Sequence, residues 1–301
     1  MIKKIKVTNH LGESITFEIR SPEKSGFLVN KIDGLGPPKA DINAMELATT
    51  DGALFNSARA RSRNIVLDLG FYPNPTIEHT RHNSYKYFPI KQRILIEVES
   101  DLRISETYGY VETNDPNIFN NDEGTIISLI CPDSFLYSKI QAVTIFSTIE
   151  SLFEFPFSNE SLTLPLLLMG EIIIDTQGNI VYTGDAPIGV TIYVNFLGSV
   201  TGLHISNDAT QEILEINDTR LAAIVGSGFT SGDLLTISTV RGNKYVRLQR
   251  AGIIYNVFNA LEPNSDWFEL EKGNNIFIYT ADTGITNLQF VIENRIAFEG
   301  A

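Results

Sequence analysis

Residues 34–70 carry three patterns in succession and read GLGPPKADINAMELATTDGALFNSARARSRNIVLDLG. The opening Gly34-Leu-Gly-Pro-Pro38 does not suit a central strand, because adjacent prolines remove backbone donors and bias the preceding residue toward extended geometry. Periodicity is weak from Lys39 to Asn56, and Asp51-Gly52 is a turn signal within that segment. We therefore expect a protruding hairpin or loop, here called the arm, over about residues 34–56.

The third pattern is an alternation of arginine with small residues that leads into a strand. Arg59, Arg61 and Arg63 precede Asn64-Ile-Val-Leu-Asp-Leu-Gly70. A period of two places the three arginines on one face of a strand. That face is either solvated and ion-paired within the chain, or it is a subunit contact in which guanidinium groups meet carboxylates of a neighbour.

Composition limits the class of protein. The chain has 301 residues, is 43% hydrophobic and carries a net charge of −13, so it can bury sizeable cores and should repel nucleic acid and anionic membranes. Its single cysteine, Cys131, excludes a disulfide framework and a cysteine zinc cluster. The N-terminus has no apolar signal segment, and the apolar stretch Leu162 to Met169 is far shorter than the roughly 20 residues of a membrane span. We expect a soluble protein made in the cytoplasm.

Short alternating runs of β-branched and aromatic residues, separated by turn residues, predict a mainly β fold. The predicted strands of the first half include Lys3–Val7, Ile15–Ile19, Arg93–Val98, Arg103–Tyr108, Gly109–Glu112 and Gly124–Ile130. One helix is expected, from the N-cap Thr76 to about Tyr87. Its predicted sheet-facing stripe consists of Ile77, Arg81, Tyr85 and Phe88.

The second half reads almost entirely as strand and turn. Strands at roughly 8–12-residue spacing, with turn signals such as Gln177-Gly-Asn179 between them, are typical of an antiparallel sandwich. Residues 1–138 have a net charge of −3 and residues 139–301 of −10, and this shift supports a boundary near Ser138. We expect an N-terminal domain over residues 1–138, containing the arm and the helix, and a second β domain over residues 139–301.

A search for catalytic chemistry finds no complete set. His79 and His82 have a spacing that can hold a metal, but no third ligand accompanies them and we interpret them as exposed polar residues. Glu97 and Glu99 share one face of a strand, which is more often a solvated face than a glycosidase site. Cys131 has no basic neighbour or helix N-terminus, so inert packing is expected. We expect no enzyme activity, cofactor or metal centre.

Two segments of the second half raise binding hypotheses. The cluster Gly226-Ser-Gly-Phe-Thr-Ser-Gly232 lacks the lysine of a phosphate-binding loop and is interpreted as a plain loop. Trp267, the single tryptophan, either stacks on a sugar at the surface or fills the core between two sheets. The first possibility leaves a carbohydrate-binding module as the alternative function.

A set of short motifs, distributed in order over most of the chain, resembles the distal tail proteins of siphophages and related tail-like particles. In the first half the motifs are Gly34–Ala40, Asp51–Phe55, Arg63–Leu67, Pro75–Glu78, Tyr85–Pro89, Gly109–Glu112 and Cys131–Asp133. In the second half they are Phe153–Phe157, Gly232–Ile237, Ser265–Leu270 and Lys272–Asn275. Each motif is modest alone, and their order and spacing carry the resemblance.

The resemblance implies a structural role at the tip of a phage tail. Proteins of this family form a homohexameric ring from an N-terminal domain that combines a β-sandwich, one helix and an extended hairpin embracing the next subunit. A galectin-like C-terminal β-sandwich lies at the periphery. The ring connects the tail tube and tape measure proteins to the tail-tip or baseplate proteins, and it is a hub for receptor-binding proteins.

Applied to this sequence, the resemblance implies a virion protein whose arm and adjoining strand form the subunit interface. The expected interface residues are Pro37, Pro38, Asp51, Gly52, Phe55, Arg59, Arg61 and Arg63. Trp267 is the expected glycan contact if the alternative function holds. No residue set matching a galectin sugar site is found in the second half.

Overall fold

Strands form most of the regular structure, which confirms the predicted mainly β fold. The computed structural model of the chain describes residues 1–46, 51–119, 122–150 and 171–301. The chain divides into two units, Met1–Ile140 with Ala297–Ala301, and Gln141–Ile296. The motif Phe153–Phe157 lies outside the described residues.

The last five residues belong to the first unit, which corrects the prediction that residues 139–301 form one domain. Strand β25 (Ala297–Phe298) pairs antiparallel with β10 (Leu136–Ser138). The Ala301 N–H then donates to the Leu35 carbonyl at 2.9 Å. The C-terminal segment thus packs on the first unit through pairing between residues far apart in the chain, and local periodicity in the sequence does not predict such pairing.

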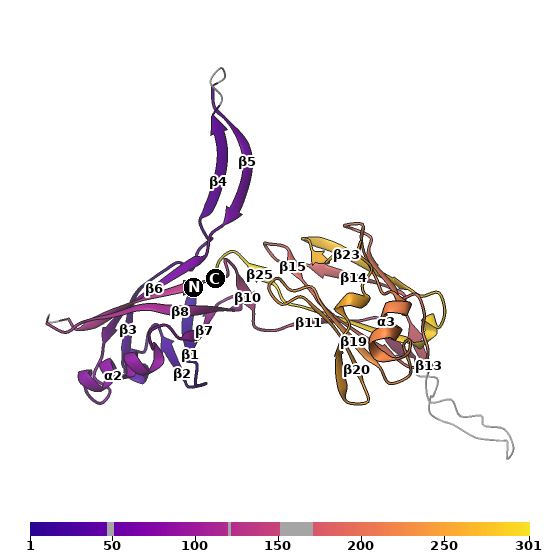
Figure 1. The fold of residues 1–301 in the computed structure, drawn as a ribbon. Coiled ribbons are helices and arrows are strands. Elements are labelled where there is room, and N and C mark those ends of the chain that lie inside the picture. The colour runs from indigo at the N-terminus through magenta and orange to yellow at the C-terminus, as the bar shows by residue number, and fades with distance from the viewer. Residues whose placement is uncertain (47–50, 120–121, 151–170) are drawn as a thin grey trace, which may run out of the picture. The chain divides into compact units, whose positions relative to one another are not determined.

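The first unit is built on one antiparallel sheet with the strand order β2-β1-β7-β8-β9-β6-β3 (Figure 1). Its strands are β1 (Ile2–Thr8), β2 (Ser14–Glu18), β3 (Phe27–Asp33), β6 (Arg63–Phe71), β7 (Arg93–Ser100), β8 (Ile104–Asn117) and β9 (Gly124–Cys131). The two strands predicted on either side of Gly109 are the single strand β8. A Cβ at Gly109 would lie 3.0 Å from the Cys131 sulfur, so this glycine makes room for a buried thiol and does not mark a turn.

The core of the first unit lies on one face of this sheet. Alternate residues of β1, β7, β6 and β9 are buried there, as a period of two requires. The two edge strands also meet, because Phe17 of β2 packs edge-to-face on Phe27 of β3 with ring centroids 5.3 Å apart. The N-terminal β-sandwich was expected to have a core between two layers of strands. In this unit both layers belong to one continuous sheet, which curves until its edge strands β2 and β3 come into contact.

The predicted helix is confirmed as α2 (Ile77–Tyr87), and the Thr76 hydroxyl accepts the His79 N–H at 3.2 Å as its N-cap. Of the predicted sheet-facing stripe, Tyr85 is exposed, and Ile77 and Arg81 are only half-buried. The buried helical residues are Thr80 and Ser84, and Phe88 enters the core just after the helix. Small side chains at these two positions let the helix lie close to the sheet. A second, very short helix is α1 (Pro22–Ser25).

The arm is a two-stranded antiparallel ribbon made of β4 (Ala40–Glu46) and β5 (Ala53–Ala60). It is hydrogen-bonded separately from the main sheet and extends away from it (Figure 1). The predicted hairpin is thus present, although its strands begin and end later in the chain than residues 34–56. Residues 34–39 form the root, the segment that connects β3 to the arm.

The second unit contains two antiparallel sheets that face each other. The six-stranded sheet has the order β11-β24-β16-β19-β20-β21 and the four-stranded sheet the order β14-β23-β17-β18. Tyr279 of β23 stacks on Phe290 of β24 with centroids 4.6 Å apart, which joins the two sheets through the core. The bounds are β11 (Ala142–Ile145), β14 (Gln177–Tyr182), β16 (Thr191–Phe196), β17 (His204–Asn207), β18 (Glu212–Glu215), β19 (Leu234–Ser238), β20 (Tyr245–Arg250), β21 (Ile253–Asn256), β23 (Gly273–Thr280) and β24 (Leu288–Asn294).

Shorter elements complete the second unit. They are β12 (Ser147–Glu150), β13 (Glu171–Ile174), β15 (Ile188–Gly189), β22 (Glu269–Leu270), and the 3-10 turns η1 (Phe258–Ala260) and η2 (Ile285–Asn287). The sequence missed helix α3 (Asp218–Val225) and misread Gln177-Gly-Asn179, which lies inside β14. Local signals for α3 were present, because Asn217 caps its first turn and Gly226 ends it with φ of 86°.

Candidate inter-subunit arm and its surroundings

The arm exposes an apolar face. Its register pairs Ile42 with Ala58 and Ala44 with Phe55, so these four side chains lie on the same side of the ribbon. Ile42 is 70% exposed and Phe55 is 63% exposed. Three more alanines extend this face, namely Ala40, Ala53 and Ala60. A two-stranded ribbon is at best marginally stable alone, and contiguous exposed apolar residues mark contact surfaces.

The predicted arm residues occupy different parts of this ribbon. Phe55 belongs to the apolar face, and Asp51 and Gly52 lie just before β5 at the far end of the arm. Sequence reasoning missed Ile42. The Asp51-Gly52 turn signal predicts a hairpin, but it does not fix the register that places Ile42 opposite Ala58. The Met45–Leu54 pair adds exposed apolar side chains on the opposite face.

The base of the arm is held by an ion-pair cluster. Asp41 of β4 lies opposite Arg59 of β5, with the Asp41 carboxylate 3.5 Å from the Arg59 Nε. Arg61, just beyond β5, donates from its Nε to the same carboxylate at 2.5 Å. Hydrogen bonding by Arg61 lowers the pKa of the Asp41 carboxyl. Arg59 and Arg61 are both exposed, so they remain accessible to a neighbour.

Arg63 has a different role from the one predicted. The chain leaves strand geometry at residues 61–62, so the three arginines do not share one strand face. Arg63 is 3% exposed and donates to four backbone carbonyls within its own unit, which makes it unavailable to a neighbour. The acceptors are Gly34 (2.5 Å), Gly36 (2.6 Å), Ser134 (2.9 and 3.1 Å) and Glu299 (2.6 Å). Burial lowers the pKa of this guanidinium.

Arg63 therefore ties the root of the arm to the C-terminal segment. The root has little freedom to change, because Gly34 has φ of 85° and a Cβ there would collide with the Asn64 carbonyl. Pro37 is exposed and Pro38 is half-buried between this anchored segment and β4. Two prolines also restrict the backbone at the point where the arm leaves the sheet. The arm thus projects from a fixed base.

Trp267 is half-buried and is neither a core residue nor an open platform. Its ring stacks on Phe258 with centroids 5.5 Å apart at 25°, and the Lys244 Nζ lies 5.2 Å from the ring centroid. Phe258 therefore covers a face of the ring, and Lys244 also lies over the ring. The neighbouring Phe268 takes the core position, being fully buried.

The remaining candidates from the sequence serve structural roles. Glu97 is buried and pairs with Lys139 (2.5 Å) and Lys6 (3.3 Å), so it does not lie on a solvated face. Burial favours a raised pKa for Glu97, but the hydrogen bonds from the two lysines outweigh it and the pKa is lowered. Glu99 pairs with Lys4 at 2.9 Å.

The histidine pair is exposed and the cysteine is buried. His79 and His82 are exposed on α2, and burial raises the pKa of the Cys131 thiol to about 11. Within the described residues, no three or more His, Cys, Asp or Glu side chains are grouped so as to hold a metal ion. The helices in that part of the chain are also too short or too polar to cross a membrane.

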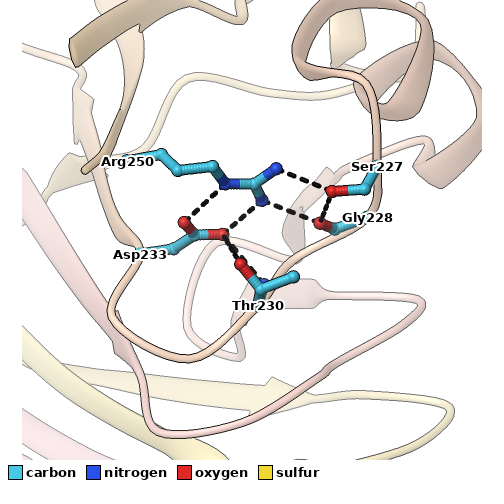
Figure 2. Close-up of polar contacts among 5 residues, drawn as sticks. All are labelled: Ser227, Gly228, Thr230, Asp233 and Arg250. Atoms are coloured by element: carbon cyan, nitrogen blue, oxygen red, sulfur yellow. Dashed lines mark hydrogen bonds and ion pairs between the residues drawn. The ribbon is translucent and has the colours of Figure 1, made fainter.

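An ion pair between half-buried Arg250 and buried Asp233, which the sequence did not reveal, braces the glycine-rich loop of residues 226–232 (Figure 2). Arg250 donates to both oxygens of Asp233 at 2.7 and 2.5 Å. The same guanidinium reaches the Ser227 hydroxyl at 2.7 Å and the Gly228 carbonyl at 2.8 Å. Asp233 also accepts the Thr230 N–H at 2.9 Å. The segment is a loop, as predicted, and it is held in one shape.

Comparisons with known proteins bear on both units. Residues 183–292 match the family described as siphovirus-type tail component, C-terminal domain. The crystal structure of SPP1 Dit (gp 19.1), described as a paradigm of the hub adsorption apparatus in phages infecting Gram-positive bacteria, matches with a TM-score of 0.66 and 14% identity, over 98% of this chain and 99% of that one. A chain from the phage P2 baseplate, in its activated conformation with Ca, matches with a TM-score of 0.50 and 10% identity over 98% of both chains.

No curated protein sequence matches the chain. At these identities the structural matches establish a shared fold, and the family match assigns the second unit. These findings confirm the resemblance to siphophage distal tail proteins: residues 183–292 match the siphovirus-type tail component C-terminal domain, and the chain has the fold of SPP1 Dit.

Proposed function

We propose that the chain is a non-enzymatic structural hub of the tail tip, in which six copies close into a ring. The ring connects the tail tube and tape measure proteins to the tail-tip or baseplate complex and carries the receptor-binding proteins. The family match of residues 183–292 and the Dit fold over 98% of the chain support this assignment.

The observation that carries the proposal is the apolar face of the arm. A ribbon that exposes Ile42 and Phe55 on a fixed base is costly for an isolated chain, because each large apolar side chain gains about 1.5–3 kcal/mol when it is buried. A neighbouring copy that covers this face recovers that free energy. When each copy lends its arm to the next, the contact is head-to-tail, and head-to-tail contacts form a ring when the rotation between neighbouring copies closes.

The second unit has the role of a peripheral domain in this proposal. We infer that it has a galectin-like β-sandwich architecture and presents braced loops, such as residues 226–232, to other tail-tip proteins. A structural role of this kind needs fixed surfaces and no reactive group.

The test is the mass of the purified chain, alone and with its tail-tube partner, by light scattering and negative-stain imaging. Wild-type protein should form a particle of six copies or annular particles on the partner. Phe55→Asp should weaken association at least tenfold, because it places a charge in the contact. The matched control is Leu11→Asp, which changes an exposed leucine (71%) of the same unit outside the arm.

The proposal fails if the wild-type chain stays monomeric at high concentration and no annuli form with the partner. It also fails if Phe55→Asp and Leu11→Asp assemble equally well. Circular dichroism of each variant separates a lost contact from a lost fold.

A further inference from the structure

A groove lies at one end of the first unit's sheet, between the end of β6 and residues 115–117 and 122–126 at the adjoining ends of β8 and β9. Its volume is about 750 Å³. The apolar part of its wall consists of Leu28, Phe71, Ile77, Pro116 and Ile126. Leu28 and Ile126 are exposed in the single chain. A space of this size admits several side chains.

The groove is strongly acidic. Asp68, Asp115, Asp122 and Glu123 line it, and none of the lining residues that the structure describes is lysine or arginine. Asp68 accepts a hydrogen bond from the Asn30 amide at 3.1 Å. Carboxylates gathered in one concave space focus a negative potential, which favours a cationic occupant.

The base of the arm carries the complementary charge. Arg59 and Arg61 both pair with the carboxylate of Asp41, and Lys39 directly precedes β4, so three cations accompany one carboxylate at the arm base. Lys39 is joined to the arm base through its carbonyl, which accepts the Arg61 N–H at 2.9 Å. The side chain of Arg59 is 84% exposed.

The two surfaces lie at opposite ends of the same pair of strands. β3 and β6 pair from Phe27↔Phe71, beside the groove, to Asp33↔Val66, beside the root of the arm. At about 3.3 Å per residue, the paired part of β3 from Phe27 to Asp33 is about 20 Å long, and the groove lies along its first half at Leu28 and Asn30. A head-to-tail association brings one end of each copy against the opposite end of the next, so it brings a basic arm base to an acidic groove.

We propose that the acidic groove receives the arm base of a second copy of this chain, with Lys39 and Arg59 meeting Asp115 and Asp122. This inference rests on the proposed ring and adds the surface that each copy offers to its neighbour. Two exposed cations of the second unit are a poorer match, because Lys244, just before β20, lies over the Trp267 ring and Arg247 of β20 lies over the Tyr245 ring.

The experiment uses two charge-reversed full-length chains and measures association by analytical ultracentrifugation. The groove variant is D115K/D122K, and both of its positions are exposed. The arm variant is K39E/R59E, which keeps the Arg61–Asp41 hydrogen bond. E269K/E271K is the control for the groove variant, since it makes the same change in net charge at exposed positions of the second unit.

Each variant alone should associate at least tenfold more weakly than wild type, because like charges then meet at every contact. An equal mixture should recover to within about threefold of wild type, since alternating copies restore opposite charges and a ring of six closes with alternation. The control should associate like wild type.

Four results overturn the inference or the ring on which it rests. If the variants associate as strongly as wild type, the proposed ring is retained and the proposed contact between the groove and the arm base is refuted. A weakened groove variant beside an unaffected arm variant, or a mixture that does not recover, shows that another surface fills the groove. A wild-type chain that is monomeric with and without its tail-tube partner overturns the ring itself, which distinguishes the two failures.

Discussion

Replacement of Arg63 by methionine tests whether one buried side chain holds the arm root and the C-terminal segment together. The guanidinium satisfies four backbone carbonyls in a nearly closed site. If each carbonyl loses about 1 kcal/mol of hydrogen bonding, the free energy of unfolding of the first unit falls by about 4 kcal/mol. Methionine retains most of the apolar stem, so the loss reports the hydrogen bonds rather than a cavity.

The assay is urea unfolding followed by two signals. Far-UV circular dichroism reports both units, whereas tryptophan fluorescence reports the second unit, because Trp267 is the single tryptophan of the chain. In Arg63→Met, the unfolding transition of the first unit should move to a lower urea concentration. Limited proteolysis should also cut the root faster, because residues 34–36 lose their anchor.

Arg61→Met is the control, since Arg61 is exposed and its partner Asp41 is also close to Arg59. It should leave the midpoint nearly unchanged. Equal midpoints for Arg63→Met and Arg61→Met would refute the reasoning, and so would an Arg63→Met loss confined to the Trp267 signal.

Two further predictions concern the second unit. Burial would raise the pKa of Asp233, but Arg250 and Thr230 outweigh it and hold the pKa below its ordinary value. The stabilisation is therefore fully present above about pH 4 and lost as pH falls through the lowered pKa. Asp233→Asn should cost about 2 kcal/mol at pH 7 and flatten this acid dependence in calorimetry. Trp267→Ala should cost about 1–2 kcal/mol, because it removes the stacking on Phe258 and the Lys244 contact from a half-buried site.

The controls for these variants are direct. Asp208→Asn changes a carboxylate of the same unit away from Arg250, and an equal acid dependence in both variants would contradict the role of Asp233. For Trp267, a loss of glycan binding on an array with unchanged stability would instead support the carbohydrate-binding alternative.

Local patterns in the sequence were sufficient for the mainly β class, for helix α2 and for the existence of the arm. Each of these depends on neighbouring residues: a period of two, a threonine N-cap, or a turn signal such as Asp51-Gly52. The motif order also identified the phage-tail resemblance. The short helix α3 escaped because its few apolar residues fit either a strand or a helix, although Asn217 and Gly226 marked its ends.

The tertiary structure alone decided how distant segments meet. Arg63 looked like its neighbours Arg59 and Arg61, but its four acceptors come from three separate parts of the chain, up to 236 residues away. The same holds for the Arg250–Asp233 pair and for the return of Ala297–Ala301 to the first unit. The acidic groove likewise collects residues from β3, β6, β8 and β9. Periodicity records which way a side chain faces, and only strand pairing determines what it faces.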